Sequence, residues 1–170
     1  LLDGQLQADI TLLNPLQQPT YVGDVSIDNL AVFQIPLGTF EGHSTNRSED
    51  EIAFDAQLKG AGNEVTLQGT YATNGRANPV EATLDIERLT AATLQTFSFG
   101  QLRNSKGYVQ GLGRITGSFD QPTWEGNLRF LDYQTTVAMS GTTLKMNNQQ
   151  IRAKDKIIYF DNFQIQDTLQ

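Results

Sequence analysis

Residues 80–87 read VEATLDIE, and apolar and polar side chains alternate along them without a break. Successive side chains of a β-strand point to opposite faces of its sheet. The stretch therefore predicts a strand with Val80, Ala82, Leu84 and Ile86 on one face and polar side chains on the other. A sheet built from such strands has one apolar face and one face in water.

The same alternation extends outward from this strand. Residues 50–61 and 65–68 repeat it, and short Gly- or Asn-containing breakers separate the patterned segments, at residues 60–63, 74–76, 140–141 and 147–148. Connections this short suit antiparallel neighbours, because parallel pairing needs crossovers of about a dozen residues. We therefore predict an all-β chain with a mostly antiparallel sheet.

Two segments depart from this pattern. Residues 43–51, HSTNRSEDE, are polar and predict a solvated loop or strand end. Residues 90–97 carry helical spacing, with Thr90 as the N-cap and Gly100 as a stop, and predict one short helix.

Composition and charge exclude several classes of function. The 170 residues contain no cysteine, which removes disulfide scaffolds, thiolate zinc sites and cysteine nucleophiles. A net charge of −7 argues against a nucleic-acid surface. The single histidine, His43, has no recognisable nucleophile spacing, and the acidic residues 49–51 lack the ordered ligand spacing of a calcium loop. We predict no enzyme activity, no catalytic residue, no metal site and no cofactor.

The chain reads as an excised piece of something longer. Its first and last residues fall inside patterned segments, and no apolar run approaches the 18 residues of a membrane-spanning helix. Residues 18–27, QPTYVGDVSI, match residues 121–130, QPTWEGNLRF, at four identical positions. We therefore expect one fragment of a repetitive β protein, with approximate repeats over 1–103 and 104–170.

Four glycines share one parity of a strand-like stretch: Gly107, Gly111, Gly113 and Gly117. Glycine weakens a strand, so its repeated use indicates either packing beneath bulky residues or strong curvature around an open concave face. The sequence leaves both interpretations open.

The apolar face is the main functional clue. Its expected members are Val25, Ile27, Ile52, Phe54, Leu58, Val65, Leu67, Val80, Leu84, Ile86, Val109, Ile115, Phe119, Trp124, Leu128, Phe130, Val137, Met139, Leu144, Met146, Ile151, Ile157, Tyr159, Phe163 and Ile165. They form either the core of a closed β-sandwich or the lining of an open groove, and composition alone favours the sandwich.

From residue 84 onward, the order of features resembles the C-terminal domain of the TamB family, the translocation and assembly module proteins of Gram-negative envelopes. The matching segments are, in order, LDIERLTAATLQTF (84–97), GYVQGLGRITGSF (107–119), QPTWEGNLRFLDY (121–133), TTVAMSGTTLKM (135–146) and IIYFDNFQIQD (157–167). The family usually has a glycine shortly after the last of these segments, where this chain has Thr168, Leu169 and Gln170.

The resemblance implies a long curved sheet, a β-taco or half-pipe with a hydrophobic groove. It implies that all of the residues above except Val25, Ile27, Val80 and Ile151 are candidates for lining that groove and binding lipid. It also implies a periplasmic segment of an inner-membrane-anchored protein, related to AsmA-like and bridge-like lipid-transfer proteins. The implied partners are phospholipid acyl chains and an Omp85-type outer-membrane protein similar to TamA.

The mechanism expected from this resemblance is lipid shielding. Each methylene moved from water to an apolar lining gains about 0.8 kcal/mol, so acyl chains could slide along the groove while head groups stay in water. A Leu128→Asp change is expected to block passage and leave the fold intact. Two alternatives stay open: a chaperone surface for nascent outer-membrane β-strands, and a closed β-sandwich binding or adhesin module.

Overall fold

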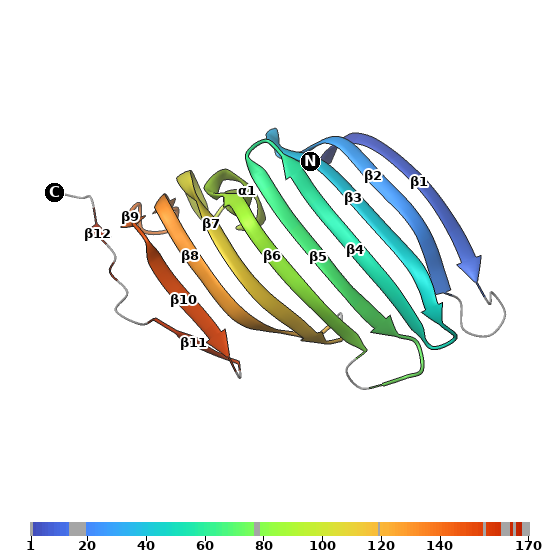
Figure 1. The fold of residues 1–170 in the computed structure, drawn as a ribbon. Helices are drawn as coiled ribbons and strands as arrows, with labels where there is room; N and C mark the ends of the chain where they lie inside the picture. The colour runs from blue at the N-terminus through green and yellow to red at the C-terminus, as the bar shows by residue number, and fades with distance from the viewer. Residues whose placement is uncertain are drawn as a thin grey trace.

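The computed structural model describes residues 2–13, 20–76, 79–118, 120–154, 156–160, 164 and 166–167. Within them, twelve strands pair antiparallel in one sheet (Figure 1). The strands are β1 (Leu2–Leu13), β2 (Thr20–Val32), β3 (Ile35–Ser48), β4 (Glu51–Gly60), β5 (Asn63–Ala72), β6 (Val80–Thr90), β7 (Leu102–Gly117), β8 (Pro122–Val137), β9 (Thr143–Met146), β10 (Gln149–Lys154), β11 (Ile157–Tyr159) and β12 (Gln166–Asp167). The predicted all-β class is confirmed.

The strands follow each other across the sheet nearly in chain order. The path runs β1-β2-β3-β4-β5-β6-β7-β8-β10-β11, and β9 pairs with the far end of β8 and with β12. The long strands bow along their length, so the sheet is curved and open, with β1 and β11 at opposite sides (Figure 1). Short connections produce this meander, because each strand returns directly beside its predecessor.

The helix prediction is confirmed. Helix α1 (Ala91–Phe97) follows β6 directly, and the Thr90 hydroxyl caps it by accepting a hydrogen bond from the Thr93 backbone N–H at 3.2 Å. Of the two alternatives predicted for residues 43–51, the strand end is observed over residues 43–48, because β3 extends to Ser48, and a turn follows at residues 49–50. His43 and Ser44 pair with β2 and with β4, and the following residues of β3 pair with β4, so backbone pairing holds this polar segment in the sheet without apolar side chains.

The sheet has an apolar face and a polar face. Directly paired residues of antiparallel strands share a face, and Leu58, Val65 and Ile86 form one such row while Lys59 and Glu64 form part of another. No second sheet packs on either face among the described residues, so the β-sandwich favoured by composition is not formed. The accessible surface is 11,193 Å², whereas a compact chain of 18.8 kDa has about 8,300 Å².

The most enclosed packing lies where α1 covers one end of the apolar face. Ala91 of α1 is buried with Val109, Tyr133 and Met146. Leu94, Leu128 and Phe130 pack around this cluster, and Phe130 meets the ring of Tyr133 edge-on with the centroids 5.2 Å apart. The helix thus holds together the ends of β6, β7 and β8.

Asn63 connects this helix to the first half of the sheet. Its side chain is only 3% exposed. The Asn63 amide donates to the Leu37 carbonyl at 2.8 Å, and the amide oxygen accepts from the Thr90 backbone N–H at 2.9 Å and from the Thr93 hydroxyl at 3.0 Å. One buried side chain therefore ties β3, β6 and α1 to the beginning of β5.

The internal repeat occupies equivalent places in the two halves. In each copy of the repeat, the described residues begin a long strand, which is β2 in the first copy and β8 in the second. Gly23 and Gly126 both lie on the apolar face, where an added Cβ would meet a backbone carbonyl of the preceding strand. The division into repeats 1–103 and 104–170 stays a prediction.

Candidate functional site: the apolar face of the sheet

Most of the predicted groove residues share one face. The register places the following side chains together on it: Ile52, Phe54, Leu58, Val65, Leu67, Leu84, Ile86, Val109, Ile115, Trp124, Leu128, Phe130, Val137, Leu144 and Met146. Val25, Ile27, Val80 and Ile151 lie on the same face. Sequence alternation therefore predicted that these residues share a face, but it missed Phe40 of β3, which pairs with Ile27 and Leu58 on the same face.

Three of the predicted residues do not belong to this face. Met139 lies in the turn after β8 and is 90% exposed. Ile157 and Tyr159 pair with Lys154 and Arg152 on the polar face, while Ile158, which pairs with Ala153, takes the apolar side.

The parity of β11 was ambiguous in the sequence because two isoleucines are consecutive there, and only the register with β10 decides between them. Phe119, Phe163 and Ile165 lie outside the described residues.

The sequence analysis missed part of the face on β1. Leu6, Ala8 and Ile10 pair with Ile27, Val25 and Gly23, so β1 extends the apolar face to the edge of the sheet. The signal was present, since these side chains alternate with polar ones in LQADI. Leu6 is 67% exposed, because no strand among the described residues lies on its outer side.

Bulky neighbours pack over the glycines of β7. The Trp124 indole lies against Gly113, and the Leu128 side chain lies against Gly111, so a methyl group at either glycine would collide with them. Of the two interpretations of the glycines, packing beneath bulky residues therefore applies to Gly111 and Gly113. The sheet in which they lie is nevertheless open. Gly107 and Gly117 instead have φ of 87° and 109°, at the irregular start and the end of β7.

Pockets open at both margins of the apolar face. One of about 480 Å³ lies beside α1, between the β2–β3 turn and the start of β7, and its lining includes Phe33, Ile35, Phe99 and Leu102. Another of about 730 Å³ lies at the opposite strand ends, where Trp124 and other residues of β8, β10 and β11 line it. Between them, unbroken rows of apolar residues cross the sheet, such as the row of Ile27, Phe40, Leu58, Val65 and Ile86.

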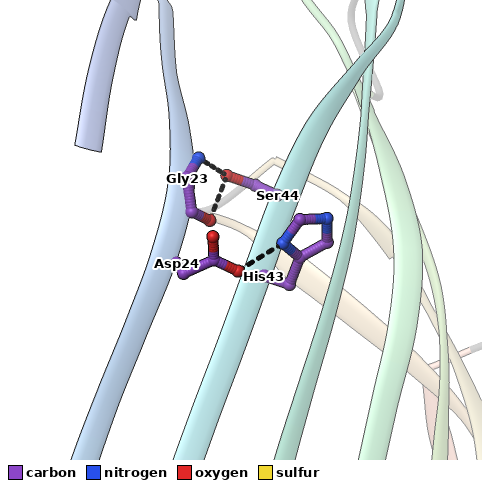
Figure 2. Close-up of polar contacts among 4 residues, drawn as sticks. All are labelled: Gly23, Asp24, His43 and Ser44. Atoms are coloured by element: carbon purple, nitrogen blue, oxygen red, sulfur yellow. Dashed lines mark hydrogen bonds and ion pairs between the residues drawn. The ribbon is translucent and has the colours of Figure 1, made fainter. Parts of the chain in front are cut away.

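The polar face carries His43, the single histidine. Its Nδ1 lies 2.6 Å from the Asp24 carboxylate on the neighbouring strand, and both side chains are exposed (Figure 2). The Ser44 hydroxyl belongs to the opposite face, where it accepts a hydrogen bond from the Gly23 N–H and donates to the Gly23 carbonyl (Figure 2). These three side chains therefore do not form a serine–histidine–aspartate relay.

A shallow polar depression of about 500 Å³ surrounds this pair across β1 to β5. Asp9, Asp24, Glu41 and Asp55 line it, so it is acidic. No group of three or more His, Asp or Glu side chains among the described residues could hold a metal ion.

One titratable group is perturbed by the helix-covered cluster. Burial raises the pKa of the Tyr133 phenol above its ordinary value of 10.0, and a hydrogen bond with Thr135 lowers it in part. The ring packs in the cluster as a neutral group, which gives it a structural place in the fold.

The fold and this surface define an open, single-layer antiparallel sheet with one apolar face. No protein-family model, curated protein or solved structure matches the chain. The resemblance to the TamB family thus remains a prediction from the sequence. No helix within the described residues is long and apolar enough to cross a membrane.

Proposed function

We propose that the apolar face holds the acyl chains of phospholipids and shields them from water. The observation that carries this proposal is the continuous row-by-row apolar face from β1 to β10, with α1 packed over one end of it. Among the described residues no second sheet covers this extended apolar face. The face therefore requires an apolar occupant or a partner, because exposed patches beyond a few hundred Å² are rare on isolated soluble proteins.

The dimensions fit a lipid chain. Ten strands stand side by side along the main path of the sheet, and at about 4.8 Å between neighbours they span about 43 Å. One leaflet of a bilayer is about 15 Å of hydrocarbon thick, half of the whole core. An acyl chain can therefore lie across several strands, and each buried methylene contributes about 0.8 kcal/mol.

The wider setting follows from the resemblance. In this proposal the chain is a periplasmic segment of a TamB-like envelope protein that conducts phospholipid between the inner and the outer membrane. An Omp85-type protein is its outer-membrane partner, and the segment contributes to outer-membrane protein assembly. Lipid would enter and leave without specific polar contacts, so the proposal needs no catalytic residue.

The test uses two leucines in neighbouring strands that face opposite sides. Leu84 of β6 lies on the apolar face and pairs with Gly113 of β7. Leu112, which precedes Gly113 in β7, lies on the polar face, pairs with Asp85 and is 54% exposed. Leu84→Gln should abolish co-purifying phospholipid in native mass spectrometry and slow transfer of a fluorescent phospholipid between vesicles. Leu112→Gln should leave both unchanged.

Equal losses in the two variants, or wild-type protein that neither carries nor takes up phospholipid, would refute the proposal. These leucines replace Leu128→Asp as the test. Leu128 packs against the buried cluster beneath α1, so the expectation that its charged variant keeps the fold is not supported by its position.

A second function has one observation in its favour. The outer side of β1 has no partner among the described residues, and β1 is 12 residues long with an alternating apolar face. Such an edge can accept another strand by backbone hydrogen bonding, as a chaperone for nascent outer-membrane β-strands would. A proline at Ala8, which removes a backbone donor, should weaken capture of an outer-membrane strand peptide and leave lipid binding intact.

A further inference from the structure

We propose that the strand ends next to α1 form a membrane-docking rim that inserts into the interface of a lipid bilayer. The rim consists of residues 33–34, 61–62, 91–101 and 138–142. These are the β2–β3 turn, the β4–β5 turn, α1 with its connection to β7, and the β8–β9 turn.

The rim segments lie at one end of the strands. β2, β4, β6 and β8 run in the same direction, so their last residues meet at this end, beside α1 (Figure 1). Contacts join the segments: the Ala138 N–H donates to the Gln101 carbonyl at 2.8 Å, and Phe33 and Phe99 line one pocket.

The rim is uncharged and carries exposed apolar side chains. None of its residues is Asp, Glu, Lys or Arg. Phe33 is 62% exposed, Phe97 57%, Phe99 87% and Met139 90%. The opposite strand ends carry Glu49, Asp50, Asp120 and Lys156 in their turns. The turns at the two ends therefore differ in charge, and the charges nearest to the rim are in the strands, among them Asp3, Lys59 and Glu64.

Two of these phenylalanines hold unfavourable backbone conformations. Phe33 and Gln34 have φ of 51° and 67°, a two-residue hairpin turn that ordinarily takes Asn-Gly, and Phe99 has φ of 51°. Left-handed φ is uncommon for a bulky residue, and such strain concentrates at functional positions. The sequence thus places aromatic rings in water at positions where asparagine or glycine would be lower in free energy.

A bilayer interface is the occupant that this chemistry fits. Phenylalanine and other apolar side chains of surface-bound segments bury at the boundary between head groups and acyl chains, and moving a charge there is costly, so an uncharged rim with three phenylalanines and a methionine can enter without desolvating an ion. The first charge behind the rim on β7 is Arg103, which lines the pocket beside Phe33 and Phe99. Its guanidinium would lie at the level of the lipid phosphates, which every glycerophospholipid carries.

The rim is distinct from the lipid-holding face, and its test is separate. Docking places the margin of the apolar face beside the bilayer, but binding of whole vesicles does not require that the face hold an acyl chain. Vesicle binding therefore tests whether the rim docks on a bilayer, and the comparison of Leu84→Gln with Leu112→Gln tests whether the apolar face holds lipid.

The experiment measures cosedimentation of the full chain with neutral phosphatidylcholine vesicles in low and high salt. The decisive variant is Phe33→Asn with Phe99→Asn, since asparagine tolerates left-handed φ and should keep or raise the thermal midpoint. We expect wild-type binding that is insensitive to salt, and about a tenfold weaker partition for each phenylalanine removed. Leu112→Asn, an exposed apolar residue on the polar face, should bind like wild type.

Several results would overturn the rim: wild-type protein that ignores neutral vesicles, binding confined to anionic vesicles and lost in salt, or undiminished binding by the double variant. An equal loss in Leu112→Asn would also overturn it. If the double variant fails to fold, Met139→Ser, in an exposed turn, provides the same comparison with an expected loss of several-fold.

Discussion

Replacing Asn63 by alanine tests whether one buried amide holds the helix to the sheet. The change removes three hydrogen bonds of a buried side chain, to the Leu37 carbonyl, the Thr90 N–H and the Thr93 hydroxyl. Each is worth about 1 kcal/mol net, and a buried partner left unpaired costs a further 1–3 kcal/mol. We therefore expect a loss of about 4–6 kcal/mol in the free energy of unfolding.

Urea denaturation followed by circular dichroism measures this loss. Asn127→Ala, at an exposed asparagine of β8, is the matched control and should cost less than about 0.5 kcal/mol. In a Thr93→Val background, the Asn63→Ala change should cost about 1 kcal/mol less, because one of the bonds is already gone. A cost below about 1 kcal/mol for Asn63→Ala in the wild-type background would show that water or relaxation replaces these bonds, and would refute the reasoning.

Three further predictions concern packing, capping and titration. Gly113→Ala should destabilise by about 1–3 kcal/mol because its methyl group would meet the Trp124 indole; Gly42→Ala, where the nearest ring atom is 3.4 Å away, should cost less in the same denaturation series. Thr90→Ala removes the helix N-cap and should cost about 1 kcal/mol, and an unchanged midpoint would contradict the cap. Burial raises the pKa of Tyr133, so the phenol stays protonated to a higher pH in the folded chain than in the unfolded chain. Its contribution to the free energy of unfolding is fully present below about pH 10 and falls as the pH rises above that value. Tyr133→Phe should flatten that alkaline loss, and identical profiles for the two proteins between pH 9 and 11 would contradict it.

Alternation in the sequence predicted the sheet for a simple reason. One-faced strands with short connections have few ways to pair other than an antiparallel meander, so residues 50–61 and 80–87 were assigned correctly. For residues 43–48, the polar side chains left open whether they form a loop or a strand end, and the structure has the strand end. Strand formation there depends on backbone pairing with β2 and β4, which side-chain polarity does not report.

The residues of the apolar face could be predicted from the sequence, except where alternation along the chain does not decide which face a side chain takes. The paired isoleucines at the start of β11 could be assigned only from register, and the exposed Met139 only from the end of β8. Whether the apolar face would be buried in a sandwich or left open was also undecided, because both arrangements use the same alternation.

By itself, the sequence determined the elements and their two-sidedness: the period of two, the short breakers, the capped helix and the absence of cysteine are local properties. Only the tertiary structure decided that the strands form a single open layer, and that Asn63 joins three elements through buried hydrogen bonds. It also gathered Phe33, Phe99 and Met139 at one uncharged end. These features depend on contacts between residues tens of positions apart, and the local pattern of side chains does not encode such contacts.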